Sequence, residues 1–191
     1  MRTVKDPEVR KQEILEGAIR FFTQKGYDKT TITDIAKELN ISQGLCYRYF
    51  SSKEEIYDAA IDEYAGYIVN EYLKNRQTDR SIHYWIDSIA DSLRNLTEAE
   101  KDQPDFYKLF HSSQNKKMHN ELFLRVVEKL IPHITDILKK AKQKGEIKID
   151  DCEGIATFGL YGEIGMFFAE GLSIEERIDK IKKAWYKLLD L

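Results

Sequence analysis

The sequence predicts an all-α protein, and three observations support this fold class. Apolar residues recur at intervals of three and four along most of the chain, which is the period of an α-helix. The 191 residues include only three prolines. Apolar residues make up 42% and charged residues 33% of the chain, a balance suited to helices with one buried and one solvated face. We expect about nine helices: a three-helix head in residues 1–53, and a second helical domain in residues 54–191 that a long helix joins to it.

The first helix is expected to run from about Pro7 to Gly26. Proline suits the first turn of a helix, where its missing N–H is not needed, and glycine suits the residue after the last turn. Apolar residues at helical spacing form its buried side, namely Ile14, Ala18, Phe21 and Phe22. This side is expected to pack on the two short helices that follow.

Residues 30–53 read as two short helices joined by a tight turn. Thr31 is expected to cap the first of them, with Asp34 as its partner in a capping box. Asn40 suits the turn because asparagine tolerates the left-handed conformation, and Ser42 can cap the second helix. Two helices that cross over such a turn form a helix-turn-helix, whose second helix can enter the major groove of DNA.

This region resembles the DNA-binding head of the tetracycline-repressor (TetR) family of bacterial transcription regulators. The matching positions are Phe22, Gly26, Tyr27, Thr30, Thr31, Ile35, Ala36, Ile41, Ser42, Gly44, Tyr47, Phe50 and Lys53. The chain departs from the family pattern at Asn40, where glycine is usual, and at Tyr49, where histidine is frequent. Asparagine also accepts a positive φ, and tyrosine can also reach a phosphate, so both departures are compatible with the resemblance.

The resemblance implies that exposed side chains of these helices bind DNA. The residues expected to hold phosphates are Thr31, Thr33, Tyr47, Tyr49 and Lys53. Those expected to face base edges are Gln43, Gly44 and Leu45; Arg48 could join either group, and the DNA-binding set also includes Ser42. Glutamine can pair with adenine, and leucine can touch a thymine methyl group. For Tyr47, a half-buried packing role is an equal alternative.

Helical periodicity continues through the second domain. The helices expected there span about residues 52–75, 81–96, from 104 onward, 122–145, 151–170 and 173–188, with loops at about 75–80 and 112–118. The helix that starts near Ser52 shows no break between the head and the second domain. It is therefore a candidate lever between them.

The last two helices are unusual in composition. The helix expected over residues 151–170 contains four glycines, and each costs about 1 kcal/mol relative to alanine. Such a helix is stabilised mainly by what packs against it, and small residues allow close approach. We predict a four-helix homodimer interface, as the resemblance also implies, formed by Ile155, Gly159, Gly162, Met166, Ile178, Ile181, Trp185 and Leu188. The alternative is that these helices only close the core of one chain.

Aromatic residues are expected to surround a ligand cavity in the second domain. The candidate lining residues are Tyr64, Tyr67, Trp85, Phe106, Phe110, Phe123, Phe158, Tyr161 and Glu163. Such a cavity would accept an apolar or aromatic small-molecule effector, and a carboxylate among aromatic rings would also suit a cation. An interface salt bridge or an exposed edge is at least as good a role for Glu163.

Other function classes find little support in the sequence. Cys46 and Cys152 are too isolated for a disulfide framework or a thiolate metal site, and the four histidines lack metal-ligand spacing. We find no phosphate-binding glycine loop, nucleophile elbow or HExxH motif, so we predict neither an enzyme nor a cofactor. No secretory signal or membrane-length apolar run is visible, so a cytoplasmic location is expected. Residues 1–53 carry ten Lys and Arg against seven Asp and Glu, which weakly favours DNA at this end.

The resemblance therefore implies a transcriptional regulator that responds to a ligand. As a homodimer it would bind a near-palindromic operator in double-stranded DNA as a repressor, and a small-molecule effector would release it. The sequence also fits a helical module that binds small molecules or proteins and no longer reads DNA. The two readings differ in one observable property, because only the regulator selects a DNA sequence.

Overall fold

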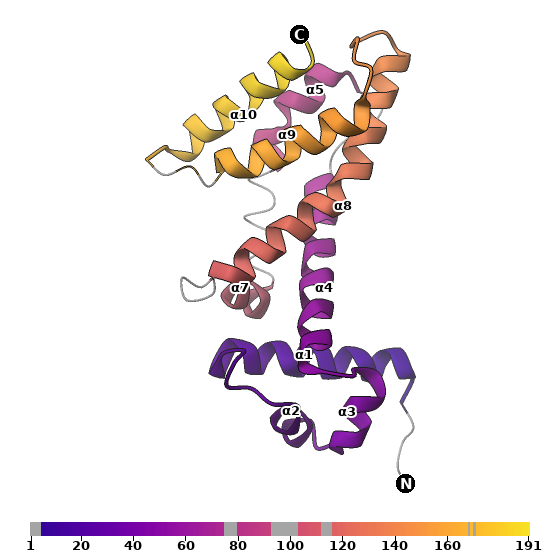
Figure 1. The fold of residues 1–191 in the computed structure, drawn as a ribbon, viewed down its shortest axis with the longest axis vertical. Helices are drawn as coiled ribbons and strands as arrows, with labels where there is room; N and C mark the ends of the chain where they lie inside the picture. The colour runs from indigo at the N-terminus through magenta and orange to yellow at the C-terminus, as the bar shows by residue number, and fades with distance from the viewer. Residues whose placement is uncertain (1–4, 75–79, 93–102, 112–115, 168, 170) are drawn as a thin grey trace. The chain divides into compact units, whose positions relative to one another are not determined.

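The computed structural model describes residues 5–74, 80–92, 103–111, 116–167, 169 and 171–191 (Figure 1). The described residues form helices joined by turns and loops, with no strand among them, which confirms the all-α prediction. The chain divides into two compact units. The first unit comprises residues 1–64 and 103–122, and the second comprises residues 65–102 and 123–191. The functional boundary expected after residue 53 is a different division and stays a prediction.

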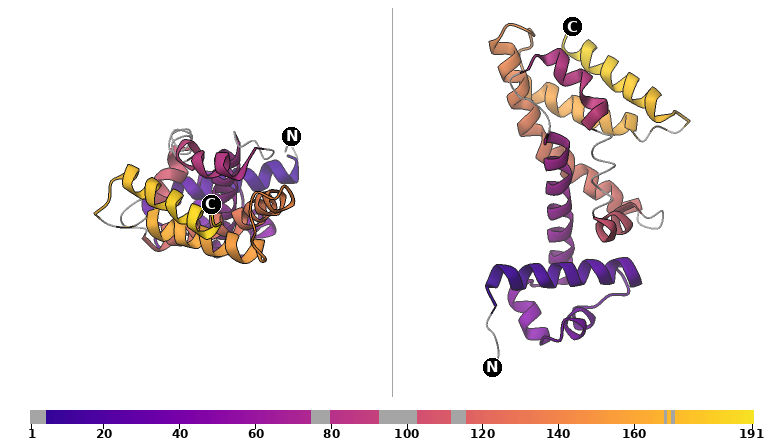
Figure 2. Two further views of the ribbon diagram at one scale, coloured as in Figure 1. Left: turned by 90° about the horizontal axis from the view of Figure 1, so that it is seen from above. Right: turned by 180° about the vertical axis from the view of Figure 1, so that it is seen from behind.

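The first unit contains α1 (Pro7–Lys25), α2 (Ile32–Glu38), α3 (Gln43–Tyr49) and α7 (Pro104–His111). Two long helices, α4 (Lys53–Leu73) and α8 (Lys116–Gln143), contribute residues 53–64 and 116–122 to it. Helix α1 lies across α2 and α3, so these three helices form the predicted head (Figures 1 and 2). This arrangement buries the apolar side of α1, where Ile14, Ala18 and Phe22 are at most 1% exposed.

Polar side chains set the helix starts and the turn of the head as the sequence predicts. Thr31 and Asp34 form a capping box at the start of α2. Ser42 accepts a hydrogen bond from the Leu45 N–H at 3.2 Å and so caps α3. Asn40 has a φ of 50°, in the left-handed region that the turn requires. These observations confirm the helix-turn-helix at the level of its local chemistry.

Helix α7 is held in the first unit by a hydrogen bond and by aromatic stacking. The Thr23 hydroxyl in α1 donates to the Asp105 carbonyl oxygen of α7 at 3.1 Å. The rings of Phe106 and Phe110 stack on Tyr64, with centroid distances of 4.9 and 5.6 Å. Because all three rings are at most 9% exposed, both apolar burial and ring stacking stabilise this contact.

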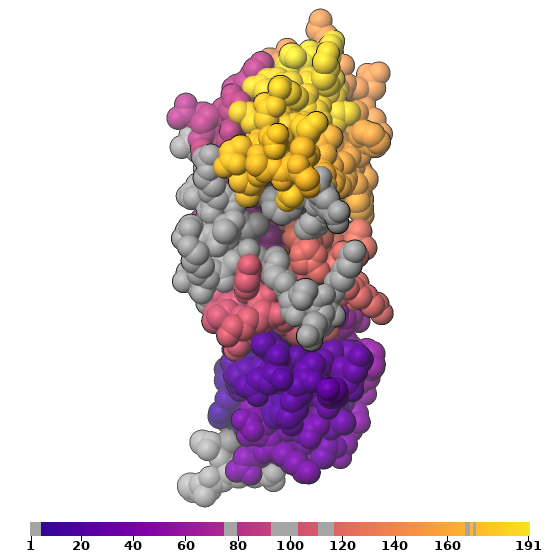
Figure 3. Space-filling model, turned by 90° about the vertical axis from the view of Figure 1, so that its left-hand side faces the viewer, coloured from indigo at the N-terminus to yellow at the C-terminus, as the bar shows by residue number. Residues whose placement is uncertain are grey.

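The second unit contains α5 (Ile82–Asp87), α9 (Cys152–Phe167) and α10 (Ile174–Leu188), with the remaining residues of α4 and α8. Helices α9 and α10 lie side by side (Figures 1 and 2), and α10 lies at the surface of this unit on the face drawn in Figure 3. Trp185 of α10 packs edge-on against Trp85 of α5, with ring centroids 4.9 Å apart. The Glu146 carboxylate accepts a hydrogen bond from the Ile82 N–H at 2.6 Å, which satisfies a donor at the start of α5.

Some predicted boundaries differ from the structure or lie outside it. The helix predicted over residues 81–96 is interrupted after Asp87, because Ser88 forms a turn and its hydroxyl donates to the Trp85 carbonyl oxygen at 2.8 Å. Helix α8 begins at Lys116, earlier than expected, while most of the predicted loop at 75–80 lies outside the described residues.

Within the described part of the chain, no helix combines the length and the apolar character that a membrane span requires.

Candidate functional site

Helix α3 presents most of its side chains outward. The exposed residues of this helix and its cap are Ser42, Gln43, Gly44, Tyr47 and Arg48. Leu45 and Tyr49 are half-buried, and Cys46 is fully buried as a small apolar core residue. Tyr47 is 49% exposed, so it is not a core residue, and its contact with DNA stays a prediction.

No packing contact among the described residues explains why position 44 is glycine. A Cβ atom added there would meet no described atom outside its own stretch of helix within 4 Å, and the φ of Gly44 lies outside the left-handed region. Glycine nevertheless costs a helix about 1 kcal/mol relative to alanine. A glycine at an exposed helical position allows a partner surface to approach the backbone closely. The local structure therefore fits a close contact with another molecule at this point of α3.

The predicted phosphate contacts at the start of α2 are Thr31, which is its N-cap residue, and Thr33. The Thr31 hydroxyl donates to Asp34 Oδ2 at 2.7 Å and accepts from the Asp34 N–H at 3.2 Å. The hydroxyl bond, together with the bond from the Thr31 N–H, lowers the pKa of the Asp34 carboxyl. Thr31 is exposed and Thr33 is half-buried, so the hydroxyl of Thr31 already caps α2 on an accessible surface.

Lys53 lies at the start of α4 and contacts Tyr27. Its ammonium donates to the Tyr27 carbonyl oxygen at 3.0 Å and lies 4.1 Å from the centroid of the Tyr27 ring. The Tyr27 hydroxyl donates to Glu54 Oε1 at 3.3 Å. Burial, reinforced by Glu54, raises the pKa of Tyr27 to about 12, so the phenol stays protonated near neutral pH. Helical periodicity cannot reveal this contact, because Tyr27 lies between α1 and α2.

The predicted ligand-binding residues are divided between the two units. Tyr64, Phe106 and Phe110 stack on one another in the core of the first unit. The others belong to the second unit: Tyr67, Trp85, Phe123, Phe158, Tyr161 and Glu163. Phe158 is 70% exposed and Tyr161 is 42% exposed, so the expectation that they face the interior of the chain is wrong. Helical spacing shows which residues share a face but not what covers that face.

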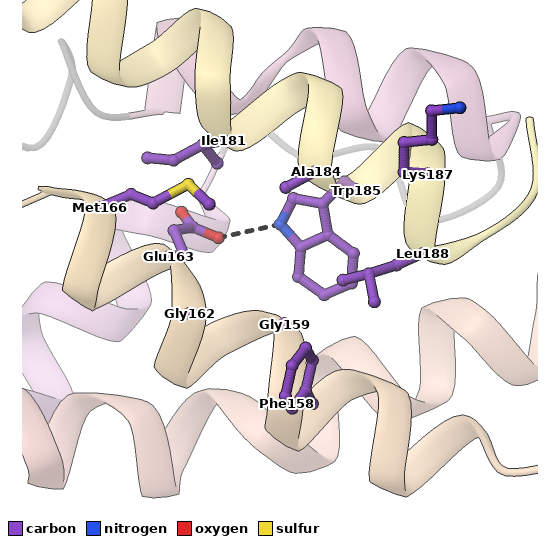
Figure 4. Close-up of a pocket in the computed structure, with 10 residues that line it drawn as sticks. All are labelled: Phe158, Gly159, Gly162, Glu163, Met166, Ile181, Ala184, Trp185, Lys187 and Leu188. Carbon is purple, nitrogen blue, oxygen red and sulfur yellow. Dashed lines mark hydrogen bonds between the residues drawn. The ribbon is translucent and has the colours of Figure 1, made fainter.

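A groove of about 310 Å³ lies between α9 and α10 (Figure 4). It is lined by Phe158, Gly159, Gly162, Glu163, Met166, Ile181, Ala184, Trp185, Lys187 and Leu188. Most of this lining is apolar. The indole N–H of Trp185 donates to Glu163 Oε2 at 3.1 Å, drawn as the dashed line in Figure 4. Glu163 therefore has a hydrogen-bonding role within its own chain that the sequence did not suggest.

The predicted interface residues divide into a buried group and a more accessible group. Ile178, Ile181 and Trp185 are at most 9% exposed within the single chain, so they are core residues. A Cβ atom on Gly159 would overlap the Trp185 ring, which explains this glycine within the chain. In the accessible group, Gly162 is exposed, and the half-buried residues are Ile155, Met166 and Leu188. The alternative that the last two helices close the core of one chain is correct for the buried group.

The head also matches a known sequence family. The family model for "Bacterial regulatory proteins, tetR family" matches residues 14–60, from α1 through the helix-turn-helix to the first part of α4. Over these residues the chain matches the TetR family. Its relatives include IcaR of Staphylococcus epidermidis, a negative transcriptional regulator of the biofilm operon icaADBC, which is 38% identical over 72 residues. That alignment covers 38% of this chain and 39% of IcaR, so the chain spans about two fifths of the curated relatives it matches.

Solved structures extend the similarity in fold to nearly the whole chain. GusR of Salmonella enterica superposes with a TM-score of 0.57 at 20% identity, covering 98% of this chain and 99% of GusR. A TetR-like transcriptional regulator from Rhodococcus sp. RHA1 gives a TM-score of 0.54 at 19% identity, covering 97% and 98% of the two chains. At these identities the likeness concerns the fold alone.

Among the described residues, no cluster of His, Cys, Asp and Glu could hold a metal ion.

Proposed function

We propose that this TetR-family chain is a ligand-responsive transcriptional repressor that binds a near-palindromic operator as a homodimer. The observation that carries the proposal is the outward-facing helix α3, held by Ser42 and Asn40 in a helix-turn-helix that the family model covers. Similarity to IcaR, a negative regulator, supports repression over activation. The proposal includes a cytoplasmic location, because a repressor must reach bacterial DNA.

The exposure of each side chain suggests its role on DNA. The exposed Gln43 and Gly44 begin α3, and the first residues of a recognition helix are the ones that reach base edges in the major groove. Leu45 would join them, and Arg48 is exposed for either a base or a phosphate. The proposed phosphate contacts are Thr31, Thr33, Tyr47, Tyr49 and Lys53. These contacts would set the register of the head without reading sequence.

A second copy of the chain is proposed to cover the groove between α9 and α10. Phe158 is 70% exposed beside this mostly apolar groove, and burial of a side chain of this size stabilises an interface by about 1.5–3 kcal/mol. Gly162 and Gly165 are exposed on α9, and a Cβ atom on either would meet no described atom outside its own stretch of helix within 4 Å. A partner helix could approach α9 closely there. The dimer would place two heads on half-sites about 34–36 Å apart, or a multiple of that distance.

The proposed effector is an apolar or aromatic small molecule. It would release DNA by binding more tightly to a conformation whose two heads no longer match the half-site spacing, and it can shift the equilibrium only by that difference in affinity. In the second unit, Tyr67 and Phe123 are half-buried aromatic residues that stay candidate contacts for it. Glu163 accepts a hydrogen bond from the Trp185 indole N–H, and a carboxylate has further acceptor sites for a cationic effector.

The roles proposed for Gln43 and Lys53 predict two different kinds of defect. We expect Gln43→Ala to lose about 1–3 kcal/mol of discrimination at one base pair, because an amide pair to adenine is removed. We expect Lys53→Ala to weaken binding to all sequences alike and to lower the slope of log affinity against log salt by about 0.9, because one phosphate contact is lost. Fluorescence anisotropy on an operator and its single-base variants, over a salt series, measures both.

Two variants serve as controls for that measurement. Gln24 is an exposed glutamine near the end of α1, and Lys108 is an exposed lysine of α7; neither belongs to the helix-turn-helix. Gln24→Ala should leave base discrimination unchanged, and Lys108→Ala should leave the salt slope unchanged. If Lys53→Ala altered base preference while Gln43→Ala altered only the salt slope, the two roles would be reversed.

A further inference from the structure

A continuous set of side-chain contacts in the first unit links Lys53 to the start of α8. The Lys53 ammonium lies over the ring of Tyr27, 4.1 Å from its centroid. The Tyr27 ring packs against the Tyr57 ring of α4, with centroids 5.0 Å apart. The Tyr57 hydroxyl then donates to Glu121 Oε2 of α8 at 2.6 Å. All four residues lie in one compact unit, so the contacts can act as one structural group.

Neighbouring rings restrict both tyrosines of this set. The Phe110 ring lies 6.5 Å from the Tyr57 ring, and the edge of Phe22 packs on Tyr27 at 5.2 Å. Turning Tyr57 would break its bond to Glu121 or leave a gap beside Phe110, and packed interiors tolerate such gaps poorly. Burial, reinforced by the bond to Glu121, raises the pKa of Tyr57 well above its usual range. The phenol therefore stays a hydrogen-bond donor throughout the physiological pH range.

An ammonium group gains from such support when it has to hold a phosphate. Lys53 carries its charge on a flexible four-carbon stem with three N–H donors. One donor is used at the Tyr27 carbonyl oxygen, 3.0 Å away, and the ring face attracts the charge. Two donors are then available to a phosphate. Fixing the ammonium before DNA arrives reduces the entropy that binding would otherwise have to remove.

We propose that Tyr57 is a positioning residue for DNA binding: through Tyr27 it holds the Lys53 ammonium in place for a backbone phosphate, and Glu121 holds Tyr57. This inference rests on the proposed DNA-binding function. It also names a route of regulation, because Glu121 belongs to the first turns of α8. A change in α8 that withdraws Glu121 frees the Tyr57 ring, and the phosphate contact weakens.

The test uses Tyr57→Leu, Lys53→Ala and the double variant with a mixed-sequence duplex of about 30 base pairs over a salt series. We expect Lys53→Ala to lower the salt slope by about 0.9, the effect of one lost phosphate contact, and Tyr57→Leu to lower it by part of that amount, because the contact is weakened. The double variant should have the same salt slope as Lys53→Ala, because both changes act on the same contact. An unchanged salt slope in Tyr57→Leu, or losses that add in the double variant, would overturn the proposal.

A second readout needs no DNA. In the wild-type protein, the ring current of Tyr27 should move the proton resonances of the Lys53 ε-methylene group upfield, and Lys53→Ala identifies these signals by removing them. Tyr57→Leu should abolish the shift. Tyr57→Phe keeps the ring and loses only the bond to Glu121, so it should remain folded and lose part of the shift, as should Glu121→Ala. An unchanged shift in both Tyr57 variants would also overturn the proposal.

Tyr107→Leu is the matched control, because Tyr107 is a tyrosine of the same unit that is 46% exposed. It should leave the Lys53 resonances and the salt slope unchanged. The inference and the proposed function can also fail separately. A wild-type protein that bound every duplex equally would contradict the proposed sequence-specific repressor. Its salt slope would still report the number of phosphate contacts. Sequence-selective binding with the same salt slope in the wild type and in Tyr57→Leu would contradict only the positioning role.

Discussion

Replacing Phe158 with glutamate is expected to convert the proposed dimer into monomers while each chain stays folded. Phe158 is 70% exposed beside the groove between α9 and α10, so the substitution removes no side chain from the core. A carboxylate enclosed in an apolar interface would lose its hydration without gaining a partner, which costs several kcal/mol. We expect the dimer dissociation constant to rise at least about 100-fold, equivalent to about 2.7 kcal/mol. Sedimentation equilibrium measures the change.

Leu124→Glu is the matched control for this substitution. Leu124 is also an exposed apolar residue of the second unit, at 48%, but it lies on α8 and is not part of the groove lining. We expect this variant to remain a dimer with unaltered DNA binding. Monomers of Phe158→Glu should bind an operator far more weakly than the dimer, because each presents only one recognition helix. A Phe158→Glu protein that kept the mass of the wild type would remove the groove from the dimer interface.

Replacing Trp185 with alanine is expected to destabilise the second unit by about 3–5 kcal/mol, the usual cost of deleting a large buried aromatic side chain. Trp185 is 1% exposed, packs edge-on against Trp85 at 4.9 Å and donates to Glu163 at 3.1 Å. The substitution leaves a cavity and removes the donor that Glu163 uses. Urea unfolding followed by far-UV circular dichroism should show the loss as a lower transition midpoint.

Two further substitutions test how the Trp185 ring packs. Trp185→Phe keeps an aromatic ring against Trp85, so we expect it to be less destabilising than Trp185→Ala. Gly159→Ala should destabilise as well, even though alanine favours helices, because the added Cβ would overlap the Trp185 ring. A Trp185→Ala protein with the urea midpoint of the wild type would show that this indole does not hold α9, α10 and α5 together.

The sequence was sufficient to predict the head in detail because its helix ends depend on local chemistry. Thr31, Asn40 and Ser42 each act on backbone groups within a few residues, and the structure shows each of them in the predicted role. The apolar side of α1 was equally readable, since a single period of 3.6 residues describes it. Contacts such as that of Lys53 with Tyr27 join residues far apart in sequence, and no local pattern reports them.

The second domain was harder to predict because its helices are apolar on more than one side. Trp185 and Phe158 are both large aromatic residues at helical spacing, yet one is 1% exposed and the other 70%. Periodicity cannot tell a face that packs within the chain from one that another molecule covers. Helical spacing alone therefore could not show that Trp185 is a core residue and Phe158 an exposed one.

The candidate ligand site was the least predictable part for the same reason. Tyr64 and Phe110 proved to be stacked core residues of the first unit, whereas Tyr161 is 42% exposed on α9. The number of aromatic residues shows how much apolar surface there is to bury. The arrangement of the helices decides whether the protein core, a ligand or a partner chain buries it. The role of Glu163 could not be predicted from sequence either, because its bond to Trp185 depends on how α9 and α10 pack.

The central claim, that α3 reads an operator, is tested most directly by selecting bound duplexes from a random pool with the wild-type protein. We predict one enriched, near-palindromic sequence whose half-site centres lie about 34–36 Å apart, or a multiple of that distance, because two symmetric heads bind together. The half-sites should change when Gln43 is replaced. Recovery of duplexes with no enriched sequence would contradict the account and leave a helical module that does not read DNA.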